Sequence, residues 1–211
     1  MGGIISCQCV PGLDTEKEIT PSDYAKVMCI NGIPKLDKVS IDAGNYKLYT
    51  ALNYDLEEGY KYFNVPPGVV NFYVSIHNDS VLFNGLANLS RGKAYTFLLY
   101  PLKTKNLERV QAMLLYDTIS DFSKTNSYFR FVNISPESPT TLLFEVKGDY
   151  SIPFGLGFRY FSKFLTVSPG NYTISVKNPE NDSTIKILRN FPFAPGKGYT
   201  IIFRGYYNSG N

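Results

Sequence analysis

The chain has 211 residues, of which 44% are hydrophobic, and 21 basic against 18 acidic residues leave a net charge of +3. This length accommodates one large domain or two of about 100 residues, and the composition is that of a folded chain rather than a disordered one. The basic residues form no continuous run, so the charge pattern predicts no nucleic-acid partner.

Residues 1–22 are expected to form a tether that carries a candidate lipid anchor. Ile4-Ile5-Ser6-Cys7 is similar to the end of a lipobox, the motif in which a cysteine of an exported bacterial protein becomes the lipidated first residue, although the basic and apolar regions that precede such a motif are missing. Residues 1–6 also match the N-myristoylation pattern, with Cys7 and Cys9 as palmitoylation candidates. A plain flexible tail is the third interpretation.

The body of the chain is expected to consist of short strands, because Tyr, Phe, Val, Ile and Thr favour strands and aromatic residues reach 15%. Candidate strands in chain order are Ala25–Asn31, Tyr46–Asn53, Val110–Tyr116, Tyr128–Ile134 and Thr141–Lys147. The only helix-like pattern, a weak one, covers Lys105–Met113. With no amphipathic helix between strands, the pattern predicts β-sandwiches rather than a parallel α/β sheet. No stretch reaches the roughly 18 apolar residues that span a bilayer.

An internal repeat organises this strand-rich region. Three landmarks recur in the same order at nearly constant spacing: Val65-Pro66-Pro67-Gly68 and Val167-Ser168-Pro169-Gly170, Asn78-Asp79-Ser80 and Asn181-Asp182-Ser183, and Gly92–Phe97 and Gly196–Ile201. Pro-Gly ends a strand, and each late block begins with a turn that leads into an apolar strand. The repeat predicts an all-β protein of two tandem immunoglobulin-like or transthyretin-like β-sandwich domains, over residues 23–121 and 122–211.

The second repeat carries a family resemblance. Phe129–Pro136, Tyr160–Gly170 and Gly196–Thr200 resemble the bacterial family known as domain of unknown function 4397. The first repeat keeps Gly92–Thr96 but diverges over Val27–Pro34. The resemblance covers residues 24–205; it implies an extracytoplasmic bacterial β-sandwich, often in tandem, and implies no reaction.

The sequence offers little material for catalysis. His77 is the only histidine, so every Ser–His–Asp, Cys–His or multi-histidine site would depend on it. Glu57 and Glu58 are adjacent, and adjacent strand residues point to opposite faces. Asp79 and Asp182 lack the oxygen spacing of a calcium loop, and the two Gly-Lys turns lack the context of a phosphate loop. We therefore expect no enzyme activity, no cofactor and no bound metal.

These observations favour a non-catalytic exported protein of the periplasm or outer cell surface, whose only contact with a membrane is the N-terminal lipid. We expect a binding or adhesion module for a surface protein or glycan. The alternative is a carbohydrate-binding accessory protein of a polysaccharide-uptake system, and a hydrolase ranks lowest. Candidate ligand-stacking residues are Tyr60, Tyr62, Arg159 and Tyr160, since tyrosine and arginine are enriched in binding hot spots; in any sandwich such residues also fill the core.

The two repeats end differently. The first continues past its late strand into Val110–Tyr116, whereas only residues 205–211 follow the strand at Tyr199–Arg204. The second domain is therefore expected to have an open sheet edge, which could accept a strand from a partner. The alternative is an edge that is short or covered by the tail.

Overall fold

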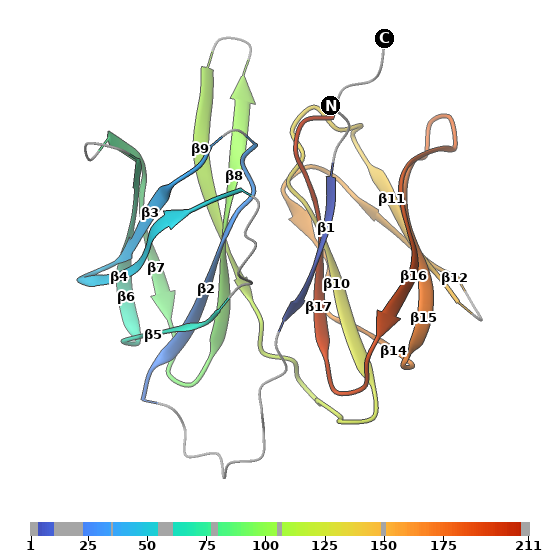
Figure 1. Ribbon diagram of the computed structural model, residues 1–211, viewed down its shortest axis with the longest axis horizontal. Coiled ribbons are helices and arrows are strands. Elements are labelled where there is room, and N and C mark those ends of the chain that lie inside the picture. Colours follow the sequence, from blue (N-terminus) through green and yellow to red (C-terminus); the bar gives the residue numbers. More distant parts are fainter. Residues whose placement is uncertain are drawn as a thin grey trace. The chain divides into compact units, whose positions relative to one another are not determined.

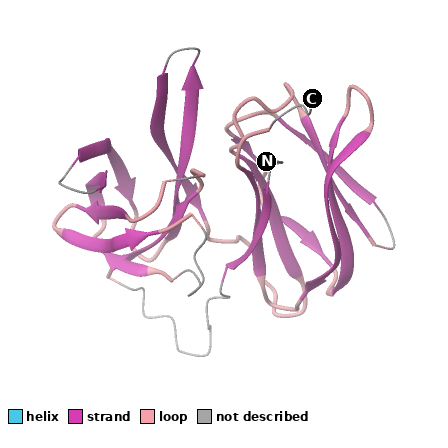
Figure 2. Cartoon of the chain, turned by 45° about the horizontal axis from the view of Figure 1, so that its top comes forward, coloured by secondary structure: helices cyan, strands magenta, loops and turns pink. Residues whose placement is uncertain are grey.

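The computed structural model describes residues 4–10, 23–34, 36–54, 61–76, 80–104, 107–148 and 151–207. Within these ranges the protein is all-β (Figures 1 and 2). Two compact units are present. We call Thr15–Thr118 the N-terminal unit, and Met1–Asp14 together with Ile119–Asn211 the composite unit. None of the described elements is a helix that could cross a membrane.

The N-terminal unit is a β-sandwich of two four-stranded sheets. Its strands are β2 (Ala25–Asn31), β3 (Val39–Ala43), β4 (Tyr46–Leu52), β5 (Phe63–Val65), β6 (Gly68–Ile76), β7 (Ser80–Leu89), β8 (Ala94–Thr104) and β9 (Leu107–Tyr116). One sheet has the order β5-β2-β8-β9 and the other β4-β3-β6-β7. All neighbours are antiparallel except β2 and β8, which are parallel with Val27 opposite Tyr95.

The composite unit is a second sandwich, and it includes the first strand of the chain. Its strands are β1 (Ile4–Val10), β10 (Ser127–Asn133), β11 (Leu142–Lys147), β12 (Ser151–Leu156), β13 (Tyr160–Phe161), β14 (Leu165–Val167), β15 (Gly170–Asn178), β16 (Ser183–Phe193) and β17 (Gly198–Arg204). One sheet has the order β1-β17-β10-β13, with β14 also on β10, and the other β12-β11-β15-β16. The parallel pair is β10 and β17, with Phe129 opposite Tyr199.

Strand pairing follows the same plan in both units. β3 lies between β4 and β6 as β11 lies between β12 and β15. β5 pairs antiparallel with β2 of the parallel pair β2–β8, and β14 pairs antiparallel with β10 of the parallel pair β10–β17. The free side of β8 is taken by β9, which follows it in a hairpin, whereas the free side of β17 is taken by β1 from the other end of the sequence (Figure 1).

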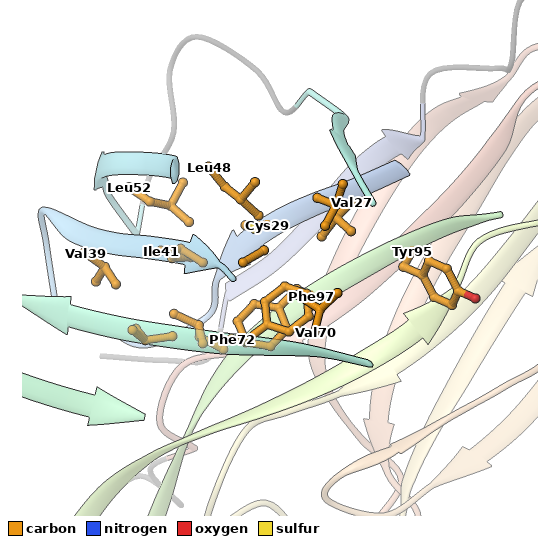
Figure 3. Close-up of a cluster of buried hydrophobic side chains, with 14 of the residues drawn as sticks. Val27, Cys29, Val39, Ile41, Leu48, Leu52, Val70, Phe72, Tyr95 and Phe97 are labelled. Carbon is orange, nitrogen blue, oxygen red and sulfur yellow. The ribbon is translucent and has the colours of Figure 1, made fainter. Parts of the chain in front are cut away.

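Alternating apolar residues of the facing sheets form a core in each unit. In the N-terminal unit the rings of Phe72 and Phe97 are stacked, with centroids 4.3 Å apart and an interplanar angle of 14°, and Val27 and Ile41 are fully buried around them (Figure 3). In the composite unit Phe131 and Phe144 have centroids 4.8 Å apart. Edge-to-face and offset aromatic pairs add to the hydrophobic contribution of burial.

The repeated Gly-Lys-x-Tyr block is a turn whose tyrosine closes the turn. Gly92 and Gly196 have φ values of 69° and 67°, a conformation that favours glycine. The residue two positions before each glycine donates its backbone N–H to a tyrosine hydroxyl. Ser90 donates to Tyr95 at 3.0 Å, and Ala194 donates to Tyr199 at 2.9 Å. The sequence identified both turns, and this hydrogen bond explains why a tyrosine recurs there.

The predicted strands are confirmed, with small differences at their ends, and the one weak helix-like pattern does not form a helix. That pattern covers Lys105–Met113, but Leu107–Tyr116 form β9, which extends the predicted strand Val110–Tyr116 and pairs with β8 along the whole length of β9. Val110, Ala112 and Leu114 pack on the core of the N-terminal unit at a period of two residues. A ten-residue ladder and this packing outweigh the weak helical propensity of the segment.

The expected tether and the expected open edge are corrected together. Ile4–Val10, which lie within the expected tether, form β1 and pair antiparallel with β17, from Ile4 opposite Arg204 to Val10 opposite Gly198. The edge of β17 that was predicted to be open is therefore filled by the chain's own first strand. Sequence reasoning compared only the segments that follow each late strand, so it missed a strand supplied from the N-terminus.

Candidate binding surface

Arg159, Tyr160 and Phe161, which we call the aromatic edge, form the most exposed aromatic segment described. Tyr160 is 65% exposed and Phe161 49% exposed, and both belong to β13, which pairs with the last two residues of β10. Two large apolar side chains at a sheet margin are the type of feature that protein or sugar ligands contact.

Backbone hydrogen bonds hold the aromatic edge to β10. The N–H of Arg159 donates to the carbonyl of Asn133 at 2.8 Å, and the N–H of Ser162 donates to the carbonyl of Phe131 at 2.9 Å. In return the N–H of Phe131 donates to Ser162 Oγ at 3.0 Å. Arg159 has a φ of 69°, so the chain turns sharply immediately before Tyr160. The two aromatic side chains are thus presented from a fixed backbone.

Gly157 leaves room for the ring of Tyr160. A Cβ at Gly157 would lie 3.4 Å from Tyr160 Cδ2 and 2.9 Å from the carbonyl oxygen of Thr140. The N–H of Tyr160 also donates to the carbonyl of Gly157 at 3.3 Å. The glycine therefore leaves space next to the ring that a larger residue would occupy, and the Tyr160 side chain stays largely exposed.

A buried asparagine fixes the turn next to the aromatic edge, and sequence reasoning did not single it out. Asn133 Oδ1 accepts the N–H of Ser135 at 3.1 Å, and its Nδ2 donates to the carbonyl of Leu156 at 3.3 Å. Asn31 accepts the N–H of Ile33 at 3.0 Å in the same way. The signal was available, because both asparagines stand three residues before a proline in the repeated opening block.

The structure places the sequence-predicted stacking residues in different parts of the chain. Arg159 and Tyr160 belong to the composite unit and Tyr62 to the N-terminal unit, and Tyr60 lies outside the described residues. The hydroxyl of Tyr62 donates to Asp117 Oδ2 at 2.9 Å, and the same oxygen accepts Thr96 Oγ1 at 2.7 Å. Tyr62 is half-buried, and its hydroxyl is engaged with a buried carboxylate.

A buried arginine was also missed. Arg130 is 2% exposed; its Nε donates to Thr200 Oγ1 at 3.0 Å, and its guanidinium carbon lies 4.6 Å from the ring centroid of Phe164. The planar guanidinium suits both a hydrogen bond and stacking on an aromatic face. Arg130 lies opposite Thr200 as Met28 lies opposite Thr96, so this position accepts a long side chain whether it is charged or apolar.

The other polar candidates form turns and surface ion pairs. Asn181 Oδ1 accepts the N–H of Ser183 at 3.1 Å and Asp182 has a φ of 51°, as in a hairpin turn. Lys177 Nζ lies 3.5 Å from Glu145 Oε2 and 3.6 Å from Asp182 Oδ1.

Four further candidates lie outside the described residues: His77, Asp79, Glu57 and Glu58. Within the described ranges no group of three His, Cys, Asp or Glu side chains could hold a metal ion. Cys7 lies in β1 opposite Ile201.

Comparison with known protein families finds a match over the first repeat and the start of the second. The family model named domain of unknown function DUF4397 matches residues 25–142. This chain belongs to the DUF4397 family. The match runs from the first residue of β2 to the first residue of β11, so it includes the block that the sequence comparison judged to be diverged. No curated protein matches the chain.

Proposed function

We propose that this DUF4397 protein is a non-catalytic, exported binding or adhesion module that acts in the periplasm or on the outer cell surface through its aromatic edge. The observation that carries the proposal is the exposure of Tyr160 and Phe161 on a backbone held by four hydrogen bonds and turns of fixed geometry. A rigid aromatic pair loses little conformational entropy when it binds.

We also infer that the two units are copies of one domain. The matching strand order, the parallel pairs β2–β8 and β10–β17, and the two Gly-Lys turns support this inference. β1 then occupies in the composite unit the place that β9 occupies in the N-terminal unit. The composite unit is a complete sandwich only when β1, from the start of the chain, is counted with the C-terminal half.

A glycan is the alternative ligand to a surface protein, as in a carbohydrate-binding accessory protein of a polysaccharide-uptake system. The absence of a Cβ at Gly157, whose position would lie 3.4 Å from the Tyr160 ring, favours this alternative, because sugar rings stack on a flat aromatic face that neighbouring side chains leave accessible. Arg159, which is exposed and precedes Tyr160 in the chain, adds hydrogen-bond donors for hydroxyl or carboxylate groups.

Binding can be tested on a glycan array and on a panel of immobilised cell-surface and matrix proteins. The double variant Tyr160→Ser with Phe161→Ser should lower the affinity for any ligand found by at least about tenfold. Tyr46→Ser is the matched control, since Tyr46 is 46% exposed on the N-terminal unit, and it should bind as the unmodified chain does. Every ligand should be recovered chemically unchanged. Equal affinity of the double variant and the unmodified chain would exclude the aromatic edge as the binding surface.

The proposed lipid anchor at Cys7 makes a separate prediction. Lipobox processing removes the residues before Cys7, and with them the partners of Arg204, Phe203 and Ile202 in the β1–β17 ladder. In its bacterial host the protein should then partition into membranes, and its mature form should begin at a lipidated Cys7. Cys7→Ser should release it from membranes. An unmodified Cys7 in the mass spectrum of the mature protein would show that β1 is retained and no anchor is attached.

A further inference from the structure

β7 is the outer strand of its sheet and presents a regular edge. The sheet order is β4-β3-β6-β7, and within the described ranges β6 alone forms a ladder with β7. From Phe83 to Leu89 each residue of β7 lies opposite one residue of β6, and the only register shift lies before Phe83. Such an edge offers a row of backbone N–H and C=O groups to a further strand.

From Phe83 to Leu89, β7 lacks the features that usually protect an edge strand. Its ten residues, Ser80–Leu89, include no charged residue and no proline. The corresponding edge strand of the composite unit, β16, carries Lys186, Arg189 and Pro192, and its ladder with β15 contains two register shifts. Charged residues, proline and bulges commonly prevent edge-to-edge pairing of strands. β16 therefore has protection against pairing with a further strand that β7 lacks.

An apolar patch lies beside the unprotected edge. Leu86 and Val69 are 74% and 72% exposed, the two most exposed large hydrophobic side chains described. Leu86 lies opposite Asn71, and Val69 lies opposite Asn88. The two apolar residues are therefore diagonal neighbours on the outer face of the sheet, within reach of each other, and they adjoin the edge itself.

We propose that a second copy of this chain pairs with β7, antiparallel and around a two-fold axis at Leu86. In this register Leu86 lies opposite its own copy, Asn84 opposite Asn88 and Gly85 opposite Ala87. The register keeps the core-facing residues of both copies on one side of the joined sheet. Ala87 packs on the core, and a Cβ at Gly85 would lie 2.7 Å from the ring of Phe83, so Gly85 also belongs to that side.

Charge and symmetry favour a second copy as the occupant. Two identical edges repel each other when they carry like charges, and β7 carries none. An interface with two-fold symmetry closes after two chains, and it removes from water the leucine of each chain that is the most exposed among the described residues. This inference does not depend on the proposed function, because β7 and the aromatic edge belong to different units.

A charge at the axis should separate the two copies. Sedimentation equilibrium over a range of protein concentrations should show reversible dimers of the unmodified chain, and Leu86→Lys should raise the dissociation constant by at least about tenfold. Ile187→Lys is the matched control, since Ile187 is 40% exposed on β16, and it should leave the dimer intact. A monomer at every concentration, or dimers that Leu86→Lys does not weaken, would overturn the proposal.

The register can be tested by cross-linking in a chain with Cys7→Ser and Cys9→Ser. Leu86→Cys should form a disulfide-linked dimer under mild oxidation, because directly opposite residues have Cβ atoms about 5 Å apart. Asn84→Cys should not link to its own copy, whereas a mixture of Asn84→Cys and Asn88→Cys chains should give mixed dimers. Equal self-linking of the Asn84→Cys and Leu86→Cys chains would overturn the register and the proposed axis.

Discussion

Aromatic side chains from facing sheets determine how closely each sandwich packs. Phe97 is 3% exposed; its ring stacks on Phe72 and lies 6.0 Å from the ring of Phe83 at an angle of 57°. Alternation along β8 places Tyr95, Phe97 and Leu99 in the core. The ring of Phe97 is therefore surrounded by groups from both sheets, and its loss would leave a cavity.

Phe97→Ala should lower the free energy of unfolding by about 3–5 kcal/mol, because the substitution removes buried apolar area and leaves a cavity. Urea denaturation followed by circular dichroism measures the change. Val81→Ala, at a site that is 55% exposed, should change stability by about 0.5 kcal/mol or less. Equal effects of the two substitutions would contradict the packing of Phe97.

Cys29 should make stability depend on pH under alkaline conditions. Burial raises the pKa of the Cys29 thiol, so the folded protein keeps it neutral, whereas in the unfolded chain it ionises near pH 8.5. Above that pH only the unfolded state gains free energy from ionisation. The contribution of the buried Cys29 thiol to the free energy of unfolding is thus fully present below about pH 8.5. Above that pH this contribution falls by up to about 1.4 kcal/mol per pH unit.

The measurement compares urea denaturation between pH 7.5 and 10 for the chain with Cys7→Ser and Cys9→Ser, with and without Cys29→Ala. The stability difference between the two chains should shrink as the pH rises. Since Tyr and Lys titrate alike in both chains, parallel pH profiles would show that Cys29 is accessible to solvent.

At the scale of elements, the two parallel pairs leave one side of β8 and one side of β17 to be filled. β9 fills the first from a hairpin in which Thr104 lies opposite Leu107. β1 fills the second from the start of the chain. A hairpin strand and a strand from the far end of the sequence make the same kind of ladder, because backbone hydrogen bonds do not depend on chain connectivity.

Deletion of residues 1–10 should weaken the composite unit at β17. Without β1 the edge of β17 faces solvent, so the amides of Gly198–Arg204 should exchange with deuterium faster than in the full chain. Deletion of residues 1–3 alone is the matched control and should leave exchange unchanged. The amides of β8 serve as an internal reference, since β9 still covers them. Unchanged protection of β17 would show that β1 contributes nothing to the sheet.

At the scale of the whole molecule, the chain closes on itself. The composite unit joins Met1–Asp14 to Ile119–Asn211, and the N-terminal unit lies between them in sequence. Contacts between β1 and β17 therefore require that most of the chain has been made. Closure of such a long loop costs entropy that grows slowly with its length, and the ladder of β1 with β17 offsets this cost.

Moving β1 should preserve the fold. In a chain that begins at residue 11, the segment Ile4–Val10 can follow Arg204 through a two-residue Asn-Gly turn, since Ile4 lies opposite Arg204 and such turns suit antiparallel hairpins. This chain should recover the β17 protection that deletion removes. Its matched control carries the same turn and residues with prolines at positions 6 and 8, which weaken ladder pairing. Recovery by both chains would argue against strand pairing as the cause.

Local patterns were enough to predict the all-β class, most strands and the repeated turns. Alternation identified β2 from Ala25 to Asn31, because one face of each strand is buried, and the Gly-Lys turns followed from the need for a positive φ. Of the candidate site, the sequence identified Arg159 and Tyr160 by residue type. It did not distinguish them from Tyr62, since exposure depends on what packs around a side chain.

Tertiary structure decided which segments complete each sheet. The first part of β9 had a weak helix-like pattern and its second part a strand pattern, and the ladder with β8 and the packing on the core made Leu107–Tyr116 one strand. β1 resembled a tether, and only the vacant side of β17 gave it a partner. The physical reason is the same in both cases: strands obtain their hydrogen bonds from partners at any sequence separation, so local propensity determines which segments can be extended, and the edges available in the folded sheets determine where they pair.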